Sequence, residues 1–104
     1  MHATLRRYEG IDEGRIDELG RKVNEGLLPK LSELPGFKGY VLMDAGNGAV
    51  SSITLFETSS QADDSNRAAA EWMQEENLAE LVPNAPKVAV RKVIAYETKA
   101  PVLA

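Results

Sequence analysis

The clearest structural signal in this chain is FKGYVLMDAGNGAVSSITLFE, residues 37–57. Its two halves, Phe37–Asp44 and Ala49–Glu57, are rich in apolar and β-branched side chains, which predicts two strands. Between them lies Ala45–Gly48, which contains Asn-Gly, the strongest short signal for a β-hairpin. We therefore expect an antiparallel hairpin at the centre of the chain.

On the N-terminal side of this hairpin, the sequence predicts one strand and one helix. Ala3–Glu9 is expected to be the strand, and Asp12 is a good N-cap for the helix that follows it. Pro29 clashes with the backbone carbonyl four residues earlier, so we expect a kink or an interruption near Glu25. The helix nevertheless has one apolar stripe with spacings of three and four, formed by Ile16, Leu19, Val23, Leu27, Leu31 and Leu34.

On the C-terminal side of the hairpin, the sequence predicts a second helix followed by a last strand. Ser59 begins a second helix that is expected to end at about Leu81, with Ser60 and Asp63 near the spacing of a capping box. Lys87–Glu97 is predicted to be the last strand. The whole is a ferredoxin-like βαββαβ domain of the α+β class, residues 1–97, with a tail at residues 98–104. Right-handed crossovers place both helices on one face of a single antiparallel sheet.

The other face of this sheet is also apolar. A water-facing sheet surface would give strands that alternate between apolar and polar residues. Four stretches instead place apolar groups on both faces: Tyr40–Met43, Leu55-Phe56, Val88–Val90 and, most clearly, Val93–Tyr96. An exposed apolar face marks an interface, and the simplest partner is a second copy of the chain, stacked sheet on sheet. The alternative is a moderately apolar face that stays exposed.

Composition removes several classes of function. The net charge is −4 and no cluster of Lys and Arg is present, which disfavours nucleic acid as a partner. The chain has no cysteine, and its only histidine is His2, near a terminus, so we expect no metal site and no cofactor held by these ligands. No stretch approaches the roughly 18 apolar residues of a membrane span. The absence of cysteine fits a cytoplasmic protein.

Three segments carry a resemblance to a known family: LPGFKGY at residues 34–40, NRAAAEWMQEENLAEL at 66–81, and VRKVIAYE at 90–97. In this order and chain length they resemble the dimeric α+β barrel superfamily, and within it the antibiotic biosynthesis monooxygenase-like group. The resemblance implies a homodimer. That group contains cofactor-free oxygenases, haem-degrading enzymes and small proteins without an assigned activity, so the resemblance leaves the function open.

The polar partners of the family tryptophan are missing here. Trp72 matches that tryptophan, but the position ten residues later, where haem-degrading members have a histidine, is Val82. The cofactor-free oxygenases have an asparagine four residues before the tryptophan and a tyrosine six residues after it, where this chain has Ala68 and Leu78. The sequence therefore disfavours haem degradation and does not carry over the family's catalytic set.

The candidate ligand-binding residues on the second helix are Trp72, Asn66 and Met73. Trp72 can form the wall of a pocket between helix and sheet and stack on a planar ligand, although a core position is the more common fate of such a residue. Asn66 and Met73 share a helical stripe with Ala69 and Asn77, and both asparagines can point into a cleft or simply face water.

The candidate catalytic residues are Trp72, Arg91, Arg7 and Tyr40. A strand arginine such as Arg7 or Arg91 can bind a carboxylate or a phenolate, or it can pair with a glutamate or reach water. Tyrosines such as Tyr8, Tyr40 and Tyr96 can donate to a bound oxygen or to the backbone.

Two functions follow from these residues. The first is a homodimer that binds a small planar, aromatic ligand between sheet and helices and has no assigned activity. The second is a cofactor-independent monooxygenase acting on a phenolic or polyketide-like substrate, in which these residues would stabilise a substrate anion.

Overall fold

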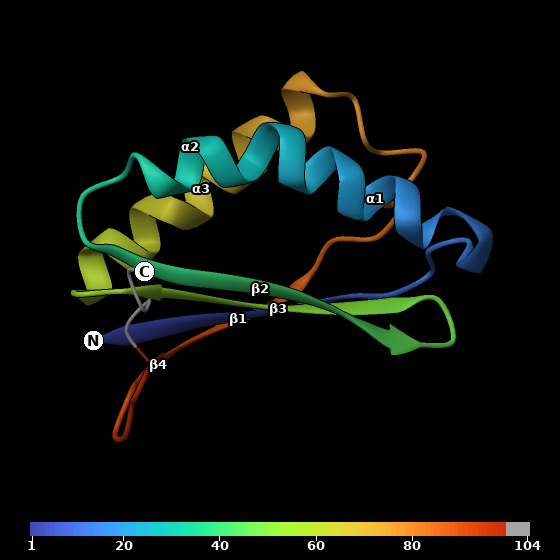
Figure 1. The fold of residues 1–104 in the computed structure, drawn as a ribbon. Coiled ribbons are helices and arrows are strands. Elements are labelled where there is room, and N and C mark those ends of the chain that lie inside the picture. Colours follow the sequence, from blue (N-terminus) through green and yellow to red (C-terminus); the bar gives the residue numbers. More distant parts are fainter. Residues whose placement is uncertain (100–104) are drawn as a thin grey trace, which may run out of the picture.

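The computed structural model describes residues 1–99 and has the predicted ferredoxin-like α+β fold (Figure 1). Four strands form one antiparallel sheet in the order β2-β3-β1-β4. Their bounds are His2–Tyr8 for β1, Phe37–Gly46 for β2, Ala49–Phe56 for β3 and Lys87–Lys92 for β4. This order, with β1 and β3 in the middle, is that of two interleaved βαβ halves.

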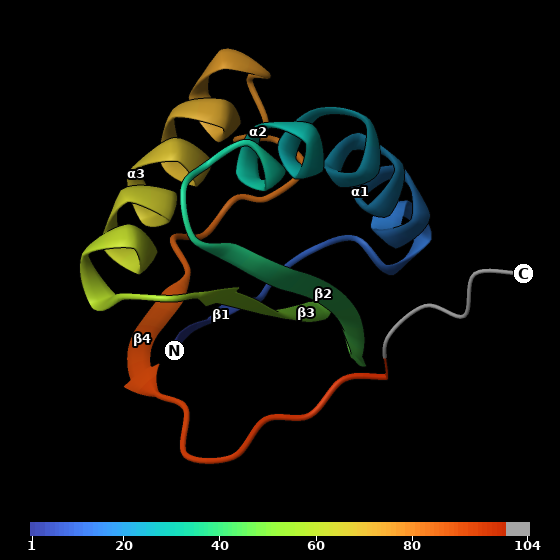
Figure 2. The same cartoon turned by 60° about the vertical axis from the view of Figure 1, so that its left-hand side comes forward.

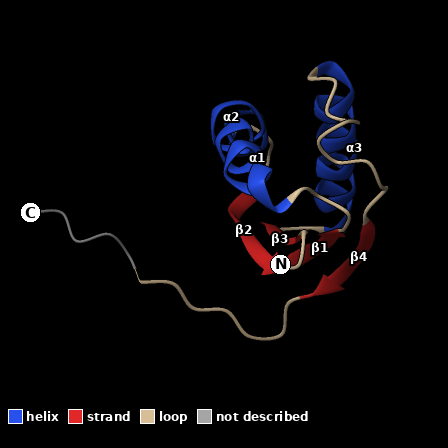
Figure 3. Ribbon diagram, turned by 90° about the vertical axis from the view of Figure 1, so that its right-hand side faces the viewer, coloured by secondary structure: helices blue, strands red, loops and turns tan. Residues whose placement is uncertain are grey.

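Both helical segments cover the same face of the sheet (Figures 1 and 3). The first connects β1 to β2 and has four consecutive parts. These are the 3-10 turn η1 (Glu13–Arg15), the α-helix α1 (Ile16–Lys22), the π-helical turn η2 (Val23–Leu27) and the α-helix α2 (Leu28–Ser32). The second, α3 (Ser59–Glu75), connects β3 to β4. No described helix is long and apolar enough to cross a membrane.

The first helical segment confirms the two local predictions made for it. The Asp12 carboxylate accepts a hydrogen bond of 2.8 Å from the backbone N–H of Gly14 and so caps the segment. The predicted interruption is the π-helical turn η2, which contains Glu25 and ends just before Pro29. Because Pro29 has no N–H to donate and its ring crowds the preceding turn, the backbone widens there.

The capping box predicted for Ser60 and Asp63 was wrong. The N-cap of α3 is Thr58, one residue before the helix begins. The backbone N–H of Gln61 donates to Thr58 Oγ1 over 3.2 Å, and the backbone N–H of Thr58 donates to Gln61 Oε1 over 3.1 Å. Thr58 is extended, as an N-cap must be, whereas Ser60 already lies in the helix.

Two elements end earlier than the sequence predicts. Helix α3 ends at Glu75 and not near Leu81, and Asn77 beyond it has a left-handed backbone with φ of 56°. Strand β4 ends at Lys92 and not at Glu97: the register with β1 runs as far as the pair of His2 and Lys92, and one further backbone hydrogen bond joins Val93 N–H to the carbonyl of Met1. Val93–Tyr96 therefore lies outside the sheet. The prediction that this stretch places apolar groups on both faces of the sheet was wrong.

The chain after β4 passes along the side of the sheet that the helices leave open (Figures 2 and 3). Ile94 in this segment is 95% exposed. Residues 100–104, most of the predicted tail, lie outside the described residues.

The core lies between the sheet and the helices. Phe56, Leu31 and Val50 are at most 2% exposed there, and Trp72 belongs to the same core cluster as Leu31 and Val50. The opposite face carries Leu5, Val41 and Met43, which are 41–45% exposed. The two-faced pattern read from Tyr40–Met43 and from Leu55-Phe56 is thus confirmed, since neighbouring residues in these strands point to opposite faces.

Candidate functional site

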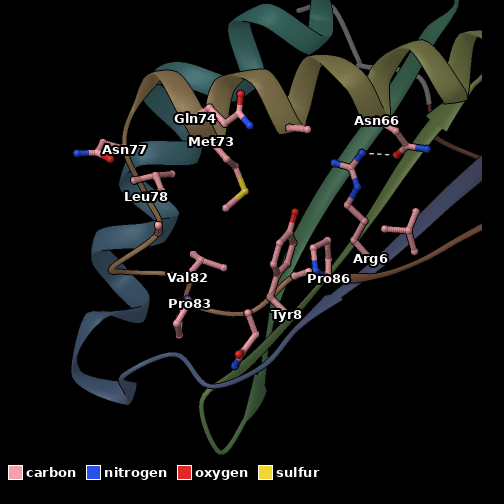
Figure 4. Close-up of a pocket in the computed structure, with 15 residues that line it drawn as sticks. Arg6, Tyr8, Asn66, Met73, Gln74, Asn77, Leu78, Val82, Pro83 and Pro86 are labelled. Carbon is pink, nitrogen blue, oxygen red and sulfur yellow. Dashed lines mark hydrogen bonds between the residues drawn. The ribbon is translucent and has the colours of Figure 1, made fainter.

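A cavity of about 560 Å³ opens between α3, the segment that follows it, and strands β1 and β4 (Figure 4). Strand β1 supplies Arg6 and Tyr8, because alternate residues of a strand point to the same face. The other lining residues come from α3, from residues 76–86 and from β4: Asn66, Ala70, Met73, Gln74, Asn77, Leu78, Ala79, Val82, Pro83, Asn84, Ala85, Pro86 and Val88.

The polar end of this cavity is built around Arg6. The side chain is only 7% exposed, and its guanidinium donates to Oδ1 of Asn66 on α3 (Figure 4). Tyr8 lies two residues further along β1, with its ring on the same face. Burial raises the pKa of Tyr8. The positive charge of Arg6, and a hydrogen bond between Arg6 and the Tyr8 hydroxyl, offset part of that rise. Tyr8 is therefore a neutral hydroxyl near pH 7, able to donate.

The remaining walls of the cavity are mostly apolar. Met73, Val82 and Pro86 are among the side chains that surround the space beside Tyr8 (Figure 4). Among the described residues that line the cavity there is no Asp, Glu or His. In residues 1–99, no group of three or more potential ligands is placed to hold a metal ion. The chemistry that these groups offer is binding of an apolar body with hydrogen bonds and positive charge at one end.

A second, interior cavity of about 30 Å³ lies deeper, between the sheet and the first helical segment. It shares Arg6, Tyr8 and Met73 with the larger cavity and adds Trp72 and Tyr40. Burial, reinforced by the neighbouring Tyr8, raises the pKa of Tyr40 to about 12. A space of this size holds about one water molecule and no organic ligand.

The tryptophan lies against the first helical segment. Its indole Nε1 is buried and has no hydrogen-bond partner among the described residues. The Cα of Gly26, in the π-helical turn, approaches this nitrogen so closely that an added Cβ would lie 2.5 Å from it. Trp72, 2% exposed, is therefore a core residue that contacts the interior cavity and not the larger one.

The structure brings together only some of the residues singled out from the sequence. Asn66 and Met73 line the larger cavity, whereas Tyr40 and Trp72 border only the interior one. Arg7 and Arg91 do not join them, because they project from the opposite face of the sheet. There Arg7 pairs with Glu9 over 2.8 Å, and the Arg91 guanidinium donates to the carbonyl of Val90.

Arg6 is the functional candidate that sequence reasoning missed. The available signal was strand alternation, which places Arg6 on the face of Thr4 and Tyr8 and its neighbour Arg7 on the other face. Leu78 and Val82, where the sequence departs from the tyrosine and histidine of the family pattern, both lie in the cavity wall.

Comparison with known proteins gives similarity of structure only. No protein-family profile matches the sequence, and no curated protein matches it. Solved structures do match. A protein of unknown function from Nitrosomonas europaea superposes with a TM-score of 0.75 at 19% identity, covering 96% of this chain and 95% of that chain.

Two further structures have the same fold. A monooxygenase from Streptomyces coelicolor, solved in complex with nanaomycin D, has a TM-score of 0.72 at 16% identity, covering 95% of this chain and 92% of that chain. A dimeric ferredoxin-like protein from an uncultured marine organism has a TM-score of 0.69 at 13% identity, covering 94% of this chain and 97% of that chain. This chain therefore shares the ferredoxin-like fold of the antibiotic biosynthesis monooxygenase-like proteins.

Proposed function

We propose that the chain is a small-molecule-binding protein whose larger cavity takes a planar organic ligand. The observation that carries this proposal is the composition of the cavity: mostly apolar walls, with one charged group, Arg6, beside the polar side chains of Asn66 and Tyr8. Ligand sites commonly have volumes of about 300–1,000 Å³ and a few polar groups that orient the ligand. The nanaomycin D complex of the structurally similar Streptomyces monooxygenase agrees with a ligand of this kind.

Binding is better supported than a cofactor-independent monooxygenase activity. That reaction needs a group to remove a proton from the phenolic substrate before oxygen can react with the anion. Arg6 could stabilise such an anion, but the described lining offers no carboxylate or imidazole as a base. Oxygen uptake with anthrone or dihydroxynaphthacene substrates at rates abolished by Arg6→Gln would overturn this preference.

We also propose that the protein is a homodimer joined through the open face of the sheet. Leu5, Val41 and Met43 on this face are each more than 40% exposed, which is costly for neighbouring apolar side chains in water. The structurally similar marine protein is dimeric. The two faces thus have separate roles: one encloses the ligand, and the other meets a second copy.

The neutral compound 2-naphthamide tests the ligand site. In two-dimensional NMR spectra of the full chain, it should shift the side-chain signals of Asn66 and Met73, which face the cavity. Ala70 is exposed at the cavity wall, so Ala70→Trp should fill part of the space and weaken binding at least tenfold. The adjacent exposed residue Glu71 does not line the cavity, so Glu71→Trp is the matched control. Equal binding by both variants would contradict the proposed site.

A further inference from the structure

The charge inside the larger cavity differs from the charge of the chain as a whole. The sequence has 16 acidic residues and a net charge of −4. Among the described residues that line the cavity, Arg6 is nevertheless the only charged one. A ligand entering this space therefore meets one positive group and no carboxylate.

Arg6 also lacks a counterion within the described residues. The six ion pairs in residues 1–99 involve other cationic side chains, including the neighbouring Arg7, which pairs with Glu9. The hydrogen-bond partners of Arg6 are both neutral: the amide oxygen of Asn66 and the hydroxyl of Tyr8. Removing a charge from water without an opposite charge is costly, so buried arginines are normally paired. An anion that enters beside Arg6 would supply the missing negative charge.

The donors around Arg6 have the geometry for one class of anion. A guanidinium has five N–H donors in a planar fork, which matches the two oxygens of a carboxylate, and Asn66 accepts only one of these donors. The ring of Tyr8 stands beside the same space (Figure 4). Because its hydroxyl stays protonated near pH 7, it is a second donor to an anionic oxygen.

We infer that the ligand is a planar organic carboxylate. Its carboxylate would bind Arg6 and Tyr8, and its apolar body would lie against Met73, Val82 and Pro86. This inference rests on the proposed ligand-binding function and adds the charge of the ligand and the residue that recognises it. Asn66 is then a positioning residue, which holds the guanidinium toward the cavity through its amide oxygen.

The test compares two probes of nearly the same shape, 2-naphthoate and 2-naphthamide, by NMR titration of the full chain at pH 7. Naphthoate should bind the wild type at least tenfold more tightly than naphthamide. Arg6→Gln should reduce this preference to less than threefold while naphthamide binding persists. Arg7→Gln removes the same charge from the next residue, on the opposite face of the sheet, and should leave the preference unchanged. Asn66→Ala should lower the preference only partly, because the charge remains.

Each outcome separates this inference from the proposed function. Equal affinity of the wild type for both probes, with shifts at Asn66 and Met73, would overturn the carboxylate inference and leave the ligand site standing. That comparison needs no variant, so it holds even if Arg6→Gln fails to fold. If neither probe shifts the cavity residues, or if the shifts map to Leu5 and Val41 on the open face, both the site and the inference are refuted.

Discussion

A pair of glycine substitutions in the first helical segment tests how tightly Trp72 is packed. Gly20 and Gly26 lie one and a half turns apart, in α1 and in the π-helical turn η2. A Cβ added at Gly20 would meet no atom within 4 Å. A Cβ added at Gly26 would lie 2.5 Å from Trp72 Nε1 and 3.1 Å from its Cε2. The same change in chemistry therefore meets open space at one site and a buried ring at the other.

The two substitutions are expected to differ in their effect on the free energy of unfolding. Replacing glycine by alanine in a helix contributes about 1 kcal/mol of stability, so Gly20→Ala should raise the free energy of unfolding by about that amount. At Gly26 the same gain is opposed by overpacking, which costs about 1–3 kcal/mol when a well-packed neighbour must shift. Trp72 is 2% exposed and has little room to move. Gly26→Ala should therefore be less stable than Gly20→Ala by about 1–3 kcal/mol.

Urea denaturation followed by the fluorescence of Trp72, the single tryptophan, measures both variants. They must be compared at one protein concentration, because the proposed dimerisation would add to apparent stability. A difference of 1 kcal/mol corresponds to about 4–8 °C in Tm for a domain of this size. If Gly26→Ala is stabilised as much as Gly20→Ala, the close approach of Gly26 to the indole is refuted.

Two further predictions concern the open face and the buried tyrosines. Val41→Lys places a charge on the apolar face, so it should convert the proposed dimer to a folded monomer in sedimentation at low micromolar concentration. Glu71→Lys, on the surface of α3, should leave the dimer intact. A wild type that is already monomeric would rule out this interface. The pKa of Tyr40, about 12 in the folded protein against 10.0 for the free group, means that the folded state keeps this proton between pH 10 and 12 while the unfolded state releases it. The free energy of unfolding should therefore lose a contribution of up to about 1.4 kcal/mol per pH unit over that range, and Tyr40→Phe should remove it in urea titrations; an unchanged slope in this variant would contradict the burial of Tyr40.

The fold was predictable because its signals are local. The Asn-Gly turn, the Asp12 cap and the apolar stripe of the first helix each depend on residues a few positions apart. One error arose where the end of a strand depends on its pairing partner and not on its own residues. Lys87–Glu97 has a strand pattern throughout, yet the strand stops at Lys92, where its register with β1 ends.

The candidate site was only partly predictable for the same reason. Asn66 and Met73 were recognised because one helical stripe contains both, and both line the cavity. Arg6 was missed although strand alternation separates it from Arg7. The role of Arg6 depends on Asn66, sixty positions away, and on the cavity wall formed by residues after α3. A single sequence gives no signal that these residues lie near Arg6.

The cavity wall after α3 has a consequence for how this protein can diversify. Residues 76–86 supply more than half of the lining, but Leu78, Leu81 and Val82 within this segment are buried and Asn84 donates to the carbonyl of Glu9 over 3.1 Å. Between these anchors, Ala79, Pro83 and Ala85 are exposed and still border the cavity. Evolution can therefore change the shape of the accepted molecule at these positions while the sheet keeps Arg6 in place. The scaffold thus separates ligand preference from folding, and a mutant library confined to these three positions would explore the first without endangering the second.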